Sequence, residues 1–167
     1  MNYLAIDAST EACSVALQVN GNIYSRYDLC PQSHSLQLLP MVDAVLNEAN
    51  ITLSQCDGLI FGRGPGSFTG VRIGVGVAQG LAFAADLPVV GVSSLQAMAQ
   101  LAFMRCKKTQ VLALIDARMN EVYNGYFVLD ENNIMQEPLL ADKKGEAVTA
   151  PELVNNRLVD SVITPVY

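Results

Sequence analysis

The sequence predicts an α/β protein of two lobes, each built on a mixed β-sheet. Short apolar segments that alternate as β-strands open the chain, and strands and helices then follow in turn. The same pattern starts again near residue 107. The triplets Ile6-Asp7-Ala8 and Ile115-Asp116-Ala117 look like an internal repeat. We therefore expect a first lobe of residues 1–105 and a second, reduced or partly missing lobe of residues 106–167.

Three antiparallel strands are expected at the start of the first lobe. Residues 3–7 form an apolar segment that ends in a carboxylate, and four alternating apolar residues follow it: Cys13, Val15, Leu17 and Val19. The pair Asn20-Gly21 favours a type I′ turn, because both central residues of that turn have positive φ. Residues 23–29 should therefore return antiparallel to the preceding strand.

Strands and helices alternate after these three strands. A helix is expected over residues 35–49, with Pro40 near its first turn or at a kink. The apolar face of this helix is predicted to hold Leu36, Leu39, Val42, Val45 and Leu46, with Leu38 and Met41 beside it. The remaining elements of the first lobe are a strand at 59–62, a helix at 69–85, a strand at 88–92 and a helix at 94–104.

The second lobe shows a shorter pattern. Residues 111–116 and 121–129 predict two strands. The segment Asp142-Lys143-Lys144-Gly145 is typical of a solvated turn, and a helix is expected to begin near Pro151.

A glycine-rich loop at residues 62–70 is the most distinctive local feature. Such a loop before a helix could hold a phosphate, because its backbone N–H groups can approach an anion closely. The known nucleotide fingerprints fail, however: no Lys follows Gly66, and the dinucleotide pattern breaks at Ser67 and Thr69. We favour the alternative, a tight turn around Pro65 with Ser67 or Thr69 as the cap of the next helix.

The helix after this loop carries glycine at positions 70, 74, 76 and 80. Each glycine in a helix interior costs roughly 1 kcal/mol relative to alanine, so close packing must offset the cost. The i, i+4 spacings leave a flat strip on which another helix could pack. A membrane span is the rival interpretation, but Arg72 and Gln79 interrupt the apolar run and Asp86 closes it short of the ~20 residues that a bilayer requires.

Composition predicts a cytosolic chain with a protein partner. The 167 residues are 51% hydrophobic but only 16% charged, against roughly 25% charged in typical soluble domains. We therefore expect apolar surface that an oligomer or an obligate partner covers. A net charge of −6 disfavours independent binding to a phosphate backbone. The four cysteines show no C-x-x-C pair, which indicates ordinary free thiols.

Four segments carry a resemblance to a known family: LAIDAST at residues 4–10, GRGPGSFTGVRIG at 62–74, VGVSSL at 90–95 and IDARM at 115–119. These segments resemble the TsaB family, also called YeaZ. The resemblance implies an actin-like ATPase architecture. It also implies a non-catalytic cytoplasmic subunit in the synthesis of N6-threonylcarbamoyladenosine, a modified base beside the tRNA anticodon.

The resemblance also implies partners. Members of the family pair with their paralogue TsaD, which transfers the threonylcarbamoyl group, and act with the ATPase TsaE. We expect the pairing surface to make a homodimer when TsaD is absent, and tRNA to be reached only through the complex. We place this interface on the first two helices, at nine apolar or small positions: Leu36, Leu39, Met41, Val45, Gly70, Ile73, Gly74, Val77 and Leu81.

The resemblance leaves little catalytic machinery in this chain. The paralogue holds a metal with two histidines, whose positions correspond here to Ser94 and Met98, so no metal ligand is expected. His34 lies on a different helix. It could act as a lone base, but we favour a helix N-terminal histidine at an interface, because no third group is indicated. We expect no catalytic residue.

A degenerate nucleotide pocket is expected at Asp7, Thr10 and Asp116. In related ATPases, carboxylates at strand ends hold Mg-nucleotide and nearby glycines admit the phosphates. Ala8 and Ser9 stand where those glycines would be, which hinders backbone approach. No cofactor of the chain's own is expected, although ATP or ADP could bind at an interface shared with the partner.

Two alternative functions come from other classes. A metallopeptidase of the glycoprotease type would need the paired histidines that this chain lacks. An actin-like small-molecule kinase would need Mg-ATP held by Asp7 and a glycine loop, and the turn Ala8-Ser9-Thr10 argues against it.

Overall fold

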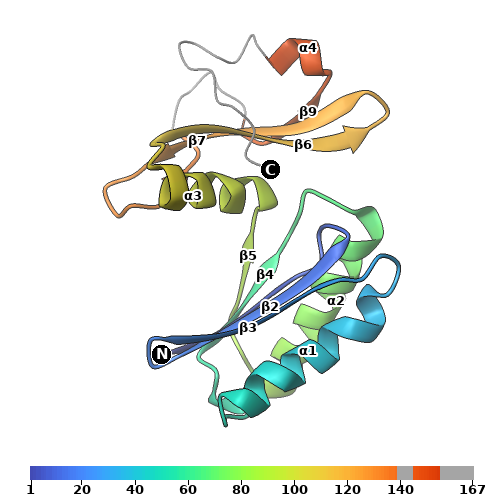
Figure 1. The fold of residues 1–167 in the computed structure, drawn as a ribbon, viewed down its shortest axis with the longest axis vertical. Coiled ribbons are helices and arrows are strands. Elements are labelled where there is room, and N and C mark those ends of the chain that lie inside the picture. Colours follow the sequence, from blue (N-terminus) through green and yellow to red (C-terminus); the bar gives the residue numbers. More distant parts are fainter. Residues whose placement is uncertain (139–144, 155–167) are drawn as a thin grey trace. The chain divides into compact units, whose positions relative to one another are not determined.

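The computed structural model describes residues 1–138 and 145–154, and the chain divides into two compact units, Met1–Ser93 and Ser94–Tyr167 (Figure 1). The predicted boundary near residue 105 therefore moves to Ser93. The reason is that helix α3, Ser94–Cys106, packs on strands of the second unit. The Gln96 side chain donates to the carbonyl of Met135 (2.9 Å), and Gln100 accepts from the Met135 N–H (2.8 Å).

The first unit contains a five-stranded sheet in the order β3-β2-β1-β4-β5. Strands β1 (Asn2–Asp7), β2 (Ala12–Val19) and β3 (Asn22–Leu29) form the predicted antiparallel meander. Strand β4 (Gly58–Gly62) runs parallel to β1, and β5 (Val89–Val92) runs parallel to β4. Between β2 and β3, Asn20 and Gly21 have the positive φ angles, 50° and 84°, that the hairpin turn requires.

Two helices cover one side of this sheet (Figure 1). Helix α1 spans His34–Glu48 and α2 spans Phe68–Ala85, with the short 3-10 helix η1 (Leu53–Gln55) between them. The core lies between the helices and the sheet and includes Leu4, Val15, Leu38, Val42 and Ala78. Successive side chains of a strand point to opposite faces of the sheet, and the burial of Cys13, Val15, Leu17 and Val19 confirms the alternation predicted for β2.

The apolar face predicted for α1 is partly wrong. Leu36 and Leu39 are 72% and 48% exposed. The buried residues of α1 are His34, Leu38, Met41, Val42, Val45 and Leu46. The buried face of α1 begins with a polar residue, His34, and continues through Leu38 and Met41. A face chosen from apolar residues alone begins instead with Leu36 and Leu39. Pro40 lies inside the helix at an exposed position.

The second unit contains a four-stranded sheet centred on β7. Strands β6 (Gln110–Arg118) and β7 (Glu121–Leu129) pair antiparallel, and β8 (Met135–Gln136) and β9 (Ala147–Thr149) both pair with β7. The wholly buried Asn124 donates to Ala147 O (3.2 Å) and Thr149 Oγ1 (2.9 Å), which fastens β9 to β7. A short helix α4, Pro151–Val154, follows. Most of the turn predicted at 142–145 lies outside the described residues.

The four glycines of α2 fall into two pairs. A Cβ at Gly70 would overlap the carbonyl oxygen of Ala8, and one at Gly74 would lie 3.7 Å from the Ala8 Cβ. A Cβ at Gly76 or Gly80 would meet nothing within 4 Å. By length and composition α2 would also suit a membrane-crossing helix, but its buried side, Gly70, Gly74 and Ala78, packs within the first unit.

The two pairs predict opposite effects of the same substitution. Gly70→Ala should lower the free energy of unfolding by about 2 kcal/mol, because the backbone of α2 must move away from Ala8. In the monomeric chain, Gly76→Ala should raise it by about 0.5–1 kcal/mol, because alanine is the better helix former and no atom of the chain outside the local helix backbone lies within 4 Å of the added Cβ. Urea denaturation of the two variants measures both changes. Equal effects of the two substitutions would contradict this arrangement.

Candidate functional site

The glycine loop, residues 62–70, closes tightly on the turn that follows β1, residues 7–10. The N–H of Ser67 donates to the carbonyl of Ser9 at 2.6 Å. A Cβ at Gly66 would overlap the same Ser9 carbonyl, and one at Gly62 would overlap the Asp7 carboxylate. The glycines of the loop are therefore required by the close approach of two stretches of the chain's own backbone.

The N-terminus of α2 is capped by a side chain of the same chain. Ser67 is the N-cap residue, and its side chain accepts a hydrogen bond from the N–H of Gly70 (3.3 Å). This confirms one of the two caps that the sequence allowed. The carbonyl oxygens of Ala8 and Ser9 lie against Gly70 and Gly66, where a phosphate-binding loop would admit an anion. These two carbonyl oxygens disfavour a bound phosphate, because their partial negative charge repels the negative charge of the anion.

The expected nucleotide-binding residues of the first unit are engaged in the turn itself. One oxygen of Asp7, Oδ1, accepts from the Ser9 N–H (2.9 Å) and the Ser9 hydroxyl (2.8 Å). The hydroxyl oxygen of Thr10 accepts from the Ala12 N–H (3.1 Å). Each of these side chains therefore stabilises the turn between β1 and β2.

Asp116 repeats this arrangement in the second unit. Its Oδ1 accepts from the N–H of Arg118 at 2.8 Å, two residues further on, as Asp7 does from Ser9. The contact between Asp116 and Arg118 therefore runs through the Arg118 backbone N–H. The similarity of the two triplets thus extends to this side-chain hydrogen bond, but Asp7 ends β1, whereas Asp116 and Arg118 lie near the end of β6, where its register with β7 shifts. That Asp7 and Asp116 share one pocket stays a prediction.

The nine residues predicted for the interface divide into three groups. Leu36 and Leu39 are exposed. Ile73, Val77 and Leu81 are half-buried. Met41, Val45, Gly70 and Gly74 are buried within the first unit, so their assignment to a partner surface is wrong for the chain as described. They were misassigned because helical periodicity does not say which stripe packs on the sheet.

The outward side of α2 holds a residue that the sequence analysis missed. Phe83 is 92% exposed, and it lies at helical spacing from Gly76 and Gly80, which have open space around them. The spacing 76, 80, 83 could have identified this stripe. Large exposed apolar side chains beside small residues are typical of helix-packing surfaces.

His34 lies in the interior, and the expectation of an interface position is wrong for it. It is 6% exposed, and its Nε2 lies 2.8 Å from the carbonyl of Thr10. Cys13 and Cys30 are its close neighbours. Burial, together with a hydrogen bond to Cys30, raises the pKa of the Cys13 thiol to about 12, so this thiol stays protonated at neutral pH and is a poor nucleophile.

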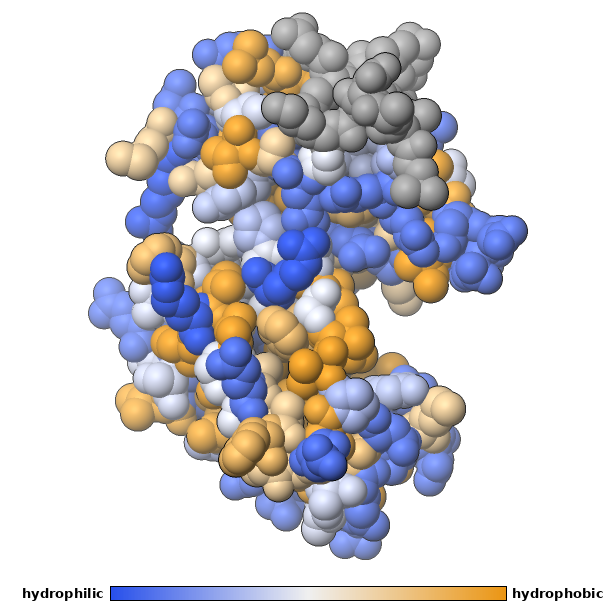
Figure 2. Space-filling model, turned by 180° about the vertical axis from the view of Figure 1, so that it is seen from behind, coloured by the Kyte–Doolittle hydropathy of each residue, from blue (hydrophilic) through white to orange (hydrophobic). Residues whose placement is uncertain are grey.

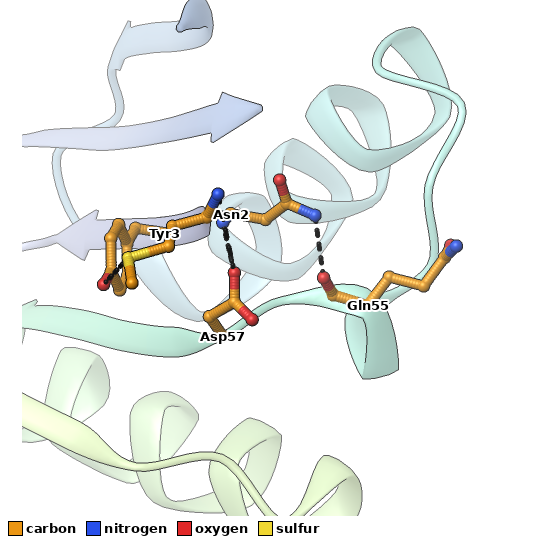
Figure 3. A network of polar contacts seen from close by, with 5 residues as sticks. Asn2, Tyr3, Gln55 and Asp57 are labelled. Carbon is orange, nitrogen blue, oxygen red and sulfur yellow. Dashed lines mark hydrogen bonds and ion pairs between the residues drawn. The ribbon is translucent and has the colours of Figure 1, made fainter. Parts of the chain in front are cut away.

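An apolar groove lies on the sheet face of the first unit opposite the helices. Its volume is about 320 Å³, and it is lined mainly by Tyr3, Ile60, Val90 and Val92. Asp57, which also lines the groove, belongs to a small polar network: the Asn2 N–H donates to Asp57 Oδ2 (2.6 Å) and the Asn2 side chain donates to Gln55 O (2.9 Å) (Figure 3). Figure 2 shows hydrophobic side chains gathered at the surface of the molecule, as the low charge content predicts.

Comparison with known proteins gives a consistent result. Residues 28–157 match the family described as TsaD, tRNA N6-adenosine threonylcarbamoyltransferase. The chain is 49% identical over 158 residues to the tRNA threonylcarbamoyladenosine biosynthesis protein TsaB of Escherichia coli, which covers 95% of this chain and 66% of that protein. The structure of YeaZ from Pseudomonas aeruginosa is 49% identical, with a TM-score of 0.82 over 90% of this chain and 68% of that one.

The chain thus spans about two thirds of the length of these relatives. A more distant likeness is to the Lmo2764 protein of Listeria monocytogenes, at 17% identity and a TM-score of 0.51 over 81% of this chain and 49% of that one. That likeness concerns the fold alone. It supports the actin-like architecture that the sequence segments implied.

The burial of the thiols predicts how they react. Cys106 is exposed, whereas Cys13, Cys30 and Cys56 are buried, and burial raises the pKa of both Cys13 and Cys56. A disulfide reagent at pH 8 should modify one thiol rapidly in the native protein and the other three only after unfolding. Cys106→Ser should remove the rapid phase. A rapid phase that survives in Cys106→Ser would contradict the burial of the other three.

Proposed function

Because this chain belongs to the TsaB family, we propose that it is a non-catalytic subunit of the bacterial system that attaches a threonylcarbamoyl group to N6 of the adenosine beside the tRNA anticodon. The observation that carries the proposal is a glycine loop closed on its own chain, in a protein that is 49% identical to a TsaB biosynthesis protein.

The absence of catalysis is supported by the chemistry of the described residues. The carboxylate of Asp7 is bound by Ser9, and the glycine loop faces carbonyl oxygens. The family resemblance places Ser94 and Met98 where TsaD has its metal-holding histidines, and both are poor ligands for a catalytic metal. The work of this subunit is then to support the transferase TsaD by binding it.

The outward sides of α1 and α2 are the surface that we assign to TsaD. Leu36, Leu39 and Phe83 expose apolar side chains, and Gly76 and Gly80 allow a partner helix to approach the α2 backbone closely. The same surface would make a homodimer when TsaD is absent. TsaE joins the complex. The chain needs no cofactor of its own, and if ATP or ADP binds, its site is shared with a partner subunit.

Binding of tRNA through the other subunits is supported by charge. A chain with a net charge of −6 repels a phosphate backbone, so basic residues of the partners must supply the electrostatic attraction. The complex acts in the cytoplasm, where tRNA is found.

Association is tested by size-exclusion chromatography with light scattering, for this chain alone and mixed with TsaD. Phe83→Asp should weaken both the homodimer and the TsaD complex at least tenfold, because a charge is placed in an apolar contact. Tyr27 is an aromatic residue of β3 that is 70% exposed and lies outside the two helices. Tyr27→Asp is therefore the matched control and should leave the homodimer and the TsaD complex unchanged. A wild-type monomer that ignores TsaD would refute the proposal.

A transfer assay separates support from catalysis. TsaD, TsaE, tRNA and the threonylcarbamoyl donor should give little product until this chain is added, and Phe83→Asp should remove its effect. Asp7→Asn, in which the amide oxygen can still accept from Ser9, should keep most of the effect, because the proposed role of Asp7 is to hold the turn. A loss of product with Asp7→Asn at unchanged TsaD binding would instead indicate a chemical role for the carboxylate.

A further inference from the structure

Two cysteines and a histidine from three separate segments meet in the interior of the first unit. Cys13 lies in β2, Cys30 directly follows β3, and His34 is the first residue of α1. Their possible ligand atoms all lie within 4.8 Å of one another, and the three residues are 0%, 6% and 6% exposed. The transfer machinery proposed above uses none of them.

The backbone holds these three residues in place. The N–H of Cys30 donates to the carbonyl of Glu11 (3.1 Å), next to β2. The N–H of Ser33 then donates to the carbonyl of Cys30 (2.9 Å), which closes a turn that brings His34 back toward Cys30. Cys30 and His34 are four positions apart, a short spacing of the kind that pairs of ligands show in structural zinc sites.

The hydrogen bond of His34 prepares its ring for coordination. A carbonyl oxygen can only accept, so Nε2 carries the proton that is donated to Thr10 O at 2.8 Å. In the neutral ring the lone pair is then on Nδ1. Metal-binding histidines commonly donate their second ring N–H to a backbone carbonyl, which fixes the tautomer and the orientation of the ring.

We propose that Cys13, Cys30 and His34 bind one divalent thiophilic cation of the Zn²⁺ class. Two thiolates and a neutral imidazole are the donors that such an ion prefers. Each thiol loses its proton to solvent as its sulfur coordinates, so two protons leave and two negative charges balance the 2+ ion. The complex is therefore neutral, which suits a buried site, whereas Cu⁺ with two thiolates would leave a negative charge there.

The site would be structural. Its ligands join β2, the end of β3 and the start of α1, and through Thr10 they also reach the turn after β1. Binding to the folded chain alone would then raise thermal stability. Within the described residues the cluster has three such ligands, so a fourth position of the tetrahedron is left for water or a backbone carbonyl.

The test uses the reduced, untagged full chain, freed of metal by a chelator under anaerobic conditions. Titration with Co²⁺ should give the intense visible absorption and the thiolate charge-transfer band of a tetrahedral site, saturating at one equivalent. Zn²⁺ should displace the Co²⁺ and raise the melting temperature. No such spectrum, or uptake of Cu⁺ with none of Co²⁺ or Zn²⁺, would overturn the proposal.

Serine variants assign the ligands. Cys13→Ser, Cys30→Ser and His34→Gln should each weaken Co²⁺ binding at least 100-fold, with the folded state of each apo variant verified by circular dichroism. Cys56→Ser removes a buried thiol outside the cluster and Cys106→Ser an exposed one, so both should bind as the wild type does. Unchanged binding in Cys13→Ser and Cys30→Ser would show that the ion sits elsewhere and would refute the site.

Discussion

The backbone of α2 lies directly against the turn that follows β1, and the first unit depends on this contact. Gly66 and Gly70 have no room for a side chain, because the carbonyls of Ser9 and Ala8 occupy the space, and the Ser67 N–H binds the Ser9 carbonyl. The contact sets the distance of α2 from the sheet and so positions Ala78 in the core. An ordinary helix with side chains at these positions could not pack this closely.

The same contact shapes what the protein can bind. The glycine loop closes on the chain's own backbone, Asp7 stabilises the turn that follows β1, and Asp116 binds the backbone at the irregular end of β6. The outward sides of α1 and α2 expose apolar side chains, and two glycines of α2 face open space there. Exposed apolar side chains are typical of protein-contact surfaces, and the low content of charged residues agrees with such a surface.

The turn after β1 is held from two sides. On one side the glycine loop binds Ser9, and on the other His34 binds the carbonyl of Thr10. His34 in turn lies against Cys13 and Cys30, so the buried polar cluster and the glycine contact stabilise one short segment. A segment fixed in this way can set the relative positions of the sheet and both helices, which is what a surface built from those helices requires.

Local signals were enough to predict the strands and longer helices of the first unit and strands β6 and β7, because alternation, helical spacing and the Asn20-Gly21 turn need no knowledge of what lies opposite. They did not predict the short elements η1, β8 and β9. Segments of the sequence also indicated the family. Which side of each element is buried follows only from the packing of the whole unit. His34 lies in the core and Leu36 outside, Gly70 faces Ala8 and Gly80 faces solvent, and α3 belongs to the second unit. The same packing brings Cys13 to Cys30 and His34. These outcomes depend on contacts between residues far apart in the chain, and periodicity within one element carries no information about its neighbours.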